Sequence, residues 1–540
     1  MNRARPWVAV AALVALPAGA TDPPLAAAER AFIDYLDAVG AAGHIESGAV
    51  DRVAQRDLVA WLAVVQAQRR ELDAALASLA ARPPPPGPQA HAVAAMRATL
   101  AALGDEDAAA TAPPPCRDAR RRDAGHAAMR AALTSCFVEY GNRLPFEGRE
   151  IDRGTALALL HTTGDPARRR ALFDAFVPLW TAINGHNEPD SPYRRLVALA
   201  AADARERGSE IDAAARAVGI APDAVERWLV RVLEAWRDAI PPGQVEPWDY
   251  RYVYSEAGRR LDGAIPAGAL RPVNDRFFAD LGADPVALGV EFDLAPRAGK
   301  SPLAYTDFLA RGRTVDGAWR RPVARVVGTY GEGGLFSLNE LVHETGHAVH
   351  VSAIHTRPAF MDWPDTLFTE AFADVPSWSV YEPAWQRRYL GVAAPAAASL
   401  RALYANVMLD VAWSLFELRL LRDPTTDPNA LWTDITHRYL RIAPHPEWPW
   451  WAMRVQLVSD PGYMVNYGLG ALLTAAMREQ VAAAIGPFDT GNAAWYPWLG
   501  EQLLRFGSER DTRSLMSGLL GGPVTPDALL RQLRRCRVQR

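Results

Sequence analysis

The chain of 540 residues is long enough to bury a large core and exceeds the usual size of one domain, so we expect two or three subdomains. Its 58 basic and 62 acidic side chains nearly cancel, and this balance gives no indication of a nucleic-acid partner. Arginine carries almost all of the positive charge, because Lys300 is the only lysine.

The first twenty residues have the three parts of a signal peptide. Arg3 and Arg5 form a basic start, residues 8–16 are apolar, and Ala18-Gly19-Ala20 is a cleavage site of small residues. The apolar run is too short to span a bilayer, and no later segment offers about eighteen uninterrupted apolar residues. We therefore expect a soluble mature protein that begins near Thr21, is periplasmic or secreted, and has no stable membrane anchor.

The mature chain is patterned mainly as helix. Apolar residues recur at helical spacing from Leu58 to Leu79, and the proline-rich run 83–88 then ends this segment and forms a stiff connection. A second break, residues 104–115, is acidic, rich in alanine and ends in three prolines. These breaks predict a helical subdomain over residues 21–115, a helical region over 116–240, and a third region over 241–540.

Three cysteines, Cys116, Cys136 and Cys536, remain in the oxidising setting that export implies. Cys116 and Cys136 lie close enough in sequence to form a local disulfide, and buried free thiols are the alternative. The odd number leaves at least one thiol unpaired within a monomer.

Strand signals are few. Residues 322–330 form a short run with β-branched side chains, and the glycine-bearing segment 331–334 follows at once. An edge strand at this position can bind an extended peptide by backbone pairing, whereas an ordinary small sheet packed on helices is the alternative.

His343-Glu344-Thr345-Gly346-His347 is the stretch with the clearest chemical meaning. On a helix, residues i and i+4 share a face, so both imidazoles can reach one metal ion, with Glu344 beside it. Ser337 and Glu340 fit a capping box, which predicts a helix that starts at Ser337. Gly346 costs such a helix about 1 kcal/mol relative to alanine, which indicates that something packs closely against its backbone.

A zinc ion held by two histidines needs a third protein ligand and leaves its fourth position for water. Glu370 lies 23 residues after His347, and Pro358 and Pro364 break the first helix so that a second can return. Asp374 shares the face of Glu370 at i+4, where it can accept the free N–H of a zinc-bound histidine. Solvated helix carboxylates are the alternative for both residues, and the motif upstream favours a site for one zinc ion per chain.

The motif region resembles the gluzincin zinc metallopeptidases. The run from His343 to His350 is similar to the pattern of the thimet oligopeptidase/oligopeptidase F family, as are residues 247–252 and residues 292–300, which contain Lys300. Residues 370–374 look like the Glu-Ala-x-x-Asp helix of the angiotensin-converting enzyme family. The similarity covers roughly residues 245–475.

The resemblance implies a mainly α fold, namely a two-lobed helical zincin-like metallopeptidase with a small β-sheet beside the active site and a deep central channel. It implies that Glu344 is the general base for a zinc-activated water, whose pKa falls to roughly 7. The oxyanion that forms next needs hydrogen-bond donors, and Tyr463 and Tyr467 are similar to the tyrosine-bearing segment of both families. Packing in the core is the alternative for these tyrosines. His350 shares the metal face but lies too far along the helix to be a ligand together with both histidines.

The substrate-binding half departs from the family pattern. The families place a histidine a few residues before the tyrosines, where this chain has Val458-Ser459-Asp460, and His445 is the nearest histidine upstream. Gly470 stands where the oligopeptidases have a further tyrosine. The pattern is therefore complete only for the metal.

We expect residues 241–540 to be the catalytic region of an exported zinc-dependent peptidase that hydrolyses short peptides. The alternative is a protein of the same fold that has lost activity and acts as a peptide-binding or scaffold protein. The presence of His343, Glu344, His347 and Glu370 argues against that alternative. The sequence does not indicate the natural substrate, the cleavage position or the oligomeric state.

Overall fold

The computed structural model describes residues 23–48, 58–81, 83–84, 86–103, 114–297, 300–301 and 303–537. The expected signal peptide over residues 1–20 lies outside these residues. The described chain is mainly helical with short strands, which confirms the expected fold class. None of the described helices is both long and apolar enough to cross a membrane.

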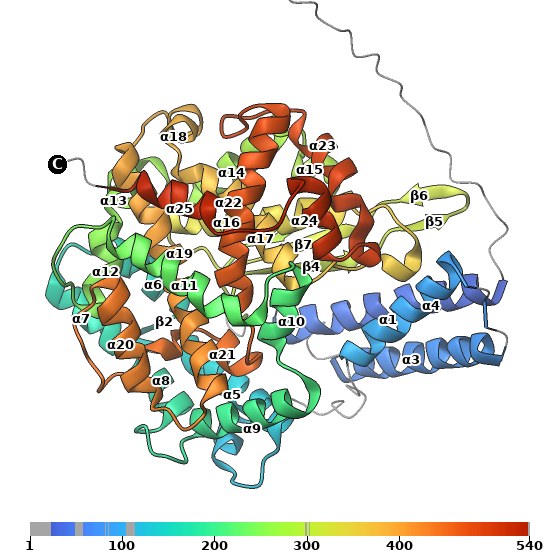
Figure 1. The fold of residues 1–540 in the computed structure, drawn as a ribbon, viewed down its shortest axis with the longest axis horizontal. Coiled ribbons are helices and arrows are strands. Elements are labelled where there is room, and N and C mark those ends of the chain that lie inside the picture. Colours follow the sequence, from blue (N-terminus) through green and yellow to red (C-terminus); the bar gives the residue numbers. More distant parts are fainter. Residues whose placement is uncertain are drawn as a thin grey trace, which may run out of the picture.

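Three N-terminal helices form a hydrophobic cluster of their own at one side of the molecule (Figure 1). They are α1 (Pro23–Glu46), α3 (Leu58–Ala81) and α4 (Pro88–Leu103). Phe360, in the 3-10 helix η5 (Pro358–Phe360), also belongs to this cluster and joins it to the rest of the protein. Helix α3 ends at Ala81, just before the proline-rich run that is predicted to end it, and α4 begins at Pro88.

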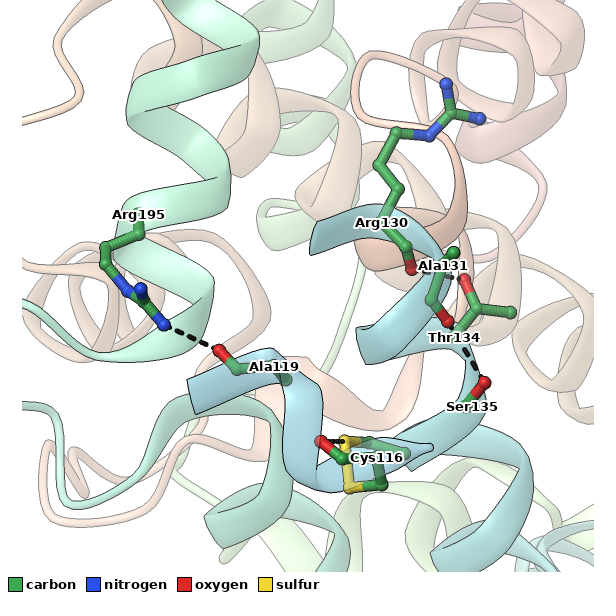
Figure 2. The surroundings of a disulfide bond; sticks show 8 residues. Cys116, Ala119, Arg130, Ala131, Thr134, Ser135 and Arg195 are labelled. Atoms are coloured by element: carbon green, nitrogen blue, oxygen red, sulfur yellow. Dashed lines mark hydrogen bonds between the residues drawn. A yellow bond between two sulfur atoms is a disulfide. The ribbon is translucent and has the colours of Figure 1, made fainter. Parts of the chain in front are cut away.

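The second region begins with a disulfide between Cys116 and Cys136, while Cys536 is a buried free thiol. The bond joins η2 to α5, and Arg195 donates a hydrogen bond of 2.6 Å to the Ala119 carbonyl of the same η2 turn (Figure 2). The region comprises η2 (Cys116–Arg120), α5 (His126–Gly141), the hairpin β1 (Leu144–Phe146) and β2 (Arg149–Ile151), α6 (Arg153–Thr162), α7 (Pro166–Asp174), α8 (Val177–Asn184), α9 (Pro192–Arg207), α10 (Glu210–Ala217) and α11 (Pro222–Arg237).

A small mixed sheet follows in the chain. Its strand order is β3-β7-β4, with β3 parallel and β4 antiparallel to β7. The strand expected within residues 322–330 is β7, which is the central strand and not an edge, so the edge-strand expectation is wrong for this segment. The elements are α12 (Pro247–Tyr254), α13 (Glu256–Leu261), η3 (Asp262–Ala264), η4 (Ala267–Ala269), α14 (Leu270–Asp280), α15 (Pro285–Leu288), β3 (Glu291–Asp293), β4 (Tyr305–Ala310), the hairpin β5 (Arg313–Val315) and β6 (Ala318–Arg320), and β7 (Val323–Val327).

The C-terminal helices stack on this sheet in layers (Figure 1). The first helix, α16, packs on β4 and β7; α17 packs on α16; α22 packs on α17; and α19 packs on α22. One continuous core unites this region with the second one. The elements are α16 (Gly334–Ala353), η5, α17 (Thr366–Ser377), η6 (Trp378–Tyr381), α18 (Pro383–Leu390), α19 (Ala396–Arg422), α20 (Pro428–Leu440), η7 (Trp450–Met453), α21 (Gln456–Ser459), α22 (Val465–Ile485), α23 (Trp495–Gln502), η8 (Leu504–Glu509), α24 (Thr512–Leu520) and α25 (Asp527–Arg534).

Lys300, the only lysine, is a buried cation that ties two strands together. Its ammonium donates hydrogen bonds to the carbonyl oxygens of Asp293, Ala295 and Gly328 at 2.8, 3.2 and 2.6 Å, and it pairs with the Asp293 carboxylate at 3.1 Å. Asp293 ends β3 and Gly328 follows β7, so one side chain holds the ends of neighbouring strands. A compact ammonium with three donors suits this position better than the planar fork of an arginine.

Replacing this lysine tests the structural role. We expect Lys300→Met to lower the free energy of unfolding by about 3 kcal/mol, because three carbonyls and a carboxylate lose their buried donor. Urea unfolding measures the change. As a control, Arg260→Gln removes an exposed pair with Glu256 and should change stability little. A loss below about 1 kcal/mol for Lys300→Met contradicts this account.

Candidate active site

Helix α16 carries the histidine motif and starts earlier than the capping box predicts. It begins at Gly334, so Ser337 lies inside the helix and not at its N-cap. The amide of Gly334 donates a hydrogen bond of 2.8 Å to the carbonyl of Ile265, which satisfies a donor at the helix start without a side-chain cap. Gly333 passes so close to Ile265 that a Cβ at this glycine would lie 2.0 Å from the same carbonyl oxygen.

Gly346 is the point where α17 meets α16. A Cβ on this glycine would lie 3.0 Å from both the Cα and the carbonyl oxygen of Ala373, and 3.3 Å from Pro376. The close contact that a mid-helix glycine predicts is therefore with the backbone of α17. Glu370 and Asp374 flank Ala373 on that helix, so the contact sets their distance from the histidines.

The structure brings the three predicted metal ligands together. The Nε2 atoms of His343 and His347 lie 3.1 Å apart, and Glu370 Oε2 lies 3.4 Å from His343 Nε2. The ligand atoms of all three residues lie within 4.8 Å of one another, and this is the one such group in the part of the chain that the structure describes. Ligand atoms about 2.0–2.1 Å from a tetrahedral ion are separated by distances close to these values of 3.1 and 3.4 Å.

The donor set also fits a metal ion chemically. Glu370 Oε2 is buried and has no hydrogen-bond donor among the described residues, which suits it to coordinate an ion. His343 Nδ1 lies 2.8 Å from Asp374 Oδ1, so the carboxylate accepts the Nδ1 proton and Nε2 faces the other ligands. Ser377 donates a second hydrogen bond to the same Asp374 oxygen at 2.9 Å and fixes that carboxylate. Asp374 thus lies where its spacing predicts.

Two of the three predicted ligands have the protonation state that binds a metal ion. Burial opposes the charged form of His343, but Asp374 and Glu370 outweigh it and raise the pKa of His343 well above its ordinary value, so this imidazole must release a proton when an ion binds. Burial and the neighbouring His343 lower the pKa of His347 to about 4, so its imidazole is neutral near pH 7. Burial opposes ionisation of Glu370, but contact with His343 and the charge of His347 outweigh it and lower the pKa of Glu370 to about 2. A neutral imidazole and an ionised carboxylate are the forms that coordinate metals.

Glu344 is held in place by a residue that the sequence analysis missed. Thr306, on β4, lies with its hydroxyl 2.8 Å from Glu344 Oε2 and 2.9 Å from the Glu344 carbonyl. Burial raises the pKa of Glu344 to about 7, a value suited to accepting a proton near neutral pH. A single threonine on a short strand gives no sequence signal of this role.

Tyr463 and Tyr467 lie at the start of α22 with their rings 5.7 Å apart. The Tyr463 hydroxyl donates a hydrogen bond of 2.8 Å to Glu370 Oε1, so this residue touches a predicted ligand directly. The Tyr467 hydroxyl accepts one of 3.1 Å from Gln456. Burial and the charge of Glu370 raise the pKa of both phenols, which therefore stay protonated and able to donate.

A cavity of about 270 Å³ opens beside Tyr463, between α10, the start of α17 and the turn before α22. Glu210, Asp365 and Asp460 line it, so the wall next to Tyr463 is acidic.

His350 and His445 have roles other than holding the metal ion. His350 is fully buried among the rings of Trp363, Phe368 and Phe372, and its ring nitrogens have no hydrogen-bond partner among the described residues. It therefore packs in the core behind the metal ligands. His445 lies 2.8 Å from both Glu246 and Glu447 and makes no described contact with the candidate ligands.

Glu417, in α19, supports the turn that carries Tyr463. Its carboxylate accepts a hydrogen bond of 2.9 Å from the Met464 amide, and only 2% of the residue is exposed. Burial raises the pKa of Glu417 to about 8, because its hydrogen bonds from the backbone do not compensate for lost hydration. The carboxyl group is therefore largely protonated in the folded protein near neutral pH.

Comparisons with known proteins give the fold. No protein-family model and no curated protein matches the sequence. An M32 carboxypeptidase from Deinococcus radiodurans R1 superposes with a TM-score of 0.57 at 15% identity, over 94% of this chain and 97% of that chain. A carboxypeptidase of Pyrococcus furiosus gives a TM-score of 0.54 at 14% identity, over 95% and 97%. The chain has the fold of the M32 carboxypeptidases.

These matches refine the family resemblance. They are similar to the chain over nearly its whole length, including the N-terminal helices that the motifs do not cover. They do not support the finer assignment to the thimet oligopeptidase or angiotensin-converting enzyme families. The motifs shared with those families surround the metal ligands, and the chain departs from those families in the segments expected to bind the substrate.

Glu417 predicts a pH dependence of stability. The unfolded chain has the ordinary carboxyl pKa of 4.5 and the folded chain about 8, so between these values the folded state holds a proton that the unfolded state lacks. Stability should therefore fall with rising pH, by about 1 kcal/mol per pH unit between pH 5 and 8 from this group.

Urea unfolding of Glu417→Gln across this pH range tests the prediction. We expect a flatter profile than wild type, with the variant gaining relative stability toward pH 8. The matched substitution Glu501→Gln, at an exposed position, should leave the dependence of stability on pH the same as in wild type. Parallel profiles for wild type and Glu417→Gln contradict the assignment.

Proposed function

We propose that this protein is a zinc-dependent peptidase that hydrolyses short peptides from the C-terminus. The observation that carries the proposal is the convergence of His343, His347 and Glu370 next to the oriented carboxylate of Glu344. The similarity to carboxypeptidases supports the exopeptidase mode.

The side chains divide the work of peptide hydrolysis. His343, His347 and Glu370 would hold zinc, which supplies a Lewis acid and brings the pKa of a bound water to roughly 7. Glu344 accepts the proton of the attacking water and can pass it to the leaving amine. We assign to Tyr463 and Tyr467 the hydrogen bonds to the negative oxygen that develops on the scissile carbonyl, and Tyr463 must then release the hydrogen bond that it donates to Glu370.

We also propose that the protein is exported. Residues 1–20 have the pattern of a signal peptide, and the Cys116–Cys136 disulfide supports an oxidising compartment.

Peptide hydrolysis by purified protein tests the function. We expect about one zinc per chain, release of C-terminal amino acids detected by mass spectrometry, and loss of activity on chelation that zinc restores. Glu344→Gln should keep its zinc and lose about 10²- to 10⁴-fold in hydrolysis rate. Glu332, an exposed residue just before α16, provides the control, and Glu332→Gln should behave as wild type.

Two outcomes decide against the proposal. A Glu344→Gln protein with zinc and full activity excludes the assigned base. Zinc binding together with peptide binding, but no hydrolysis of any peptide in a broad library, favours the alternative of an inactive peptide-binding protein.

A further inference from the structure

Three half-buried arginines from separate parts of the chain lie near the candidate site. Arg153 begins α6, Arg251 lies in α12, and Arg454 follows η7. Burial lowers the pKa of each, and the charge of Arg454 adds to the effect at Arg153 and Arg251, whose pKa falls to about 10. All three remain charged at neutral pH, so the protein holds three like charges close together.

Two of these guanidinium groups have only neutral partners. Arg153 Nε donates a hydrogen bond of 2.9 Å to the Met453 carbonyl. Arg251 lies 3.3 Å from Asn406 Oδ1 and 3.4 Å from His161 Nε2. Burial and the charge of Arg251 hold the pKa of His161 well below its ordinary value, so that imidazole is neutral.

The carboxylates nearby do not balance the three charges. Arg454 forms an ion pair with Asp410, whereas neither Arg153 nor Arg251 forms an ion pair with a described carboxylate. Glu340 lies close enough to affect Arg153 and Arg454, and burial raises its pKa, but one further carboxyl group besides Asp410 does not match three guanidinium groups. Like charges held close together with restricted access to water and too few counterions repel one another, so an arrangement of this kind favours an anionic ligand.

Arg454 brings the cluster beside the two tyrosines of the candidate site. The Arg454 guanidinium lies 5.2 Å from the centre of the Tyr467 ring, which is 5.7 Å from the Tyr463 ring. Tyr463 in turn donates its hydrogen bond to Glu370. The Arg454 side chain keeps 21% of its surface accessible, so a ligand can reach it.

We propose that Arg153, Arg251 and Arg454 select substrates whose C-terminal residue is acidic. The inference rests on the proposed function and names the residue that the site prefers to release. One guanidinium group suffices for an α-carboxylate, and two unpaired groups match the two carboxylates of a terminal aspartate or glutamate. The cavity wall beside Tyr463 is acidic, so the positive charge lies on the Tyr467 side of the two tyrosines.

Hydrolysis of matched peptides tests the selection. The substrates are N-acetylated tetrapeptides that differ only in a terminal Glu, Gln or Lys, together with the amide of the Glu peptide. We expect kcat/KM for Glu to exceed that for Gln by about tenfold or more, with Lys the poorest, and the amide to be cleaved less well than the free acid. Equal rates for Glu and Gln overturn the proposal, because only the α-carboxylate is then recognised.

Variants of Arg251 test whether the arginine cluster causes the preference for a terminal Glu. Arg251→Gln should abolish the advantage of Glu over Gln while changing the Gln peptide less, and Arg251→Lys should restore part of it because the charge is kept. The exposed Arg260 in the adjacent helix α13 provides the control, and Arg260→Gln should keep the wild-type ratio. An unchanged ratio in folded Arg251→Gln overturns the proposal.

A binding experiment separates this inference from the proposed function. N-acetylglutamate should raise the melting temperature of wild type more than N-acetylglutamine does at the same concentration, and Arg153→Gln should lose the difference. If no peptide is hydrolysed, the proposed function fails, and this measurement still decides whether the cluster binds a dianion. Equal shifts with the two ligands contradict it.

Discussion

The candidate site depends on one close contact between two helix backbones. Gly346 has no side chain, and the backbone of α17 at Ala373 fills the space where a Cβ would lie. This contact brings a helix from a later part of the chain against the histidine helix at a fixed distance. Glu370 and Asp374 then face His343 on one side, and both residues would move away if the helices separated.

The layers on either side complete the arrangement. The sheet supports α16 from below, and its edge strand β4 supplies the threonine that orients Glu344. On the other face, α22 packs on α17, where Thr474 donates a hydrogen bond of 2.8 Å to the Ala371 carbonyl. Tyr467 lies in the first turn of α22, and Tyr463 lies in the turn just before it. The side chains of the site therefore come from several layers, and helix packing aligns them. The charges are likewise divided, with carboxylates at the histidines and guanidinium groups around Tyr467.

The metal ligands are predicted well from the sequence because short-range spacing within a helix determines how they are arranged. A spacing of four residues on a helix places His343 and His347, and the same spacing relates Glu370 to Asp374. The prediction that a partner contacts Gly346 also follows from one residue, since glycine is costly within a helix. Its partner could not be read from the sequence, because Ala373 belongs to a separate helix with no marked pattern.

The rest of the site is assembled from distant segments. Thr306, Glu417 and the three arginines carry no motif, and only the fold shows that they meet. The start of α16 was misplaced because the carbonyl of Ile265, far away in sequence, replaces the expected serine cap. The short strand over Val323–Val327 was recognised, but its central position depends on β3 and β4.

The central claim is that His343, His347 and Glu370 hold one metal ion beside Glu344. Anomalous diffraction at the zinc edge from crystals of the zinc-loaded protein tests it most directly. The account predicts a single peak about 2.0–2.2 Å from the Nε2 atoms of both histidines and from a carboxylate oxygen of Glu370. A peak at other residues, or no peak at this site in protein that retains zinc, would contradict it.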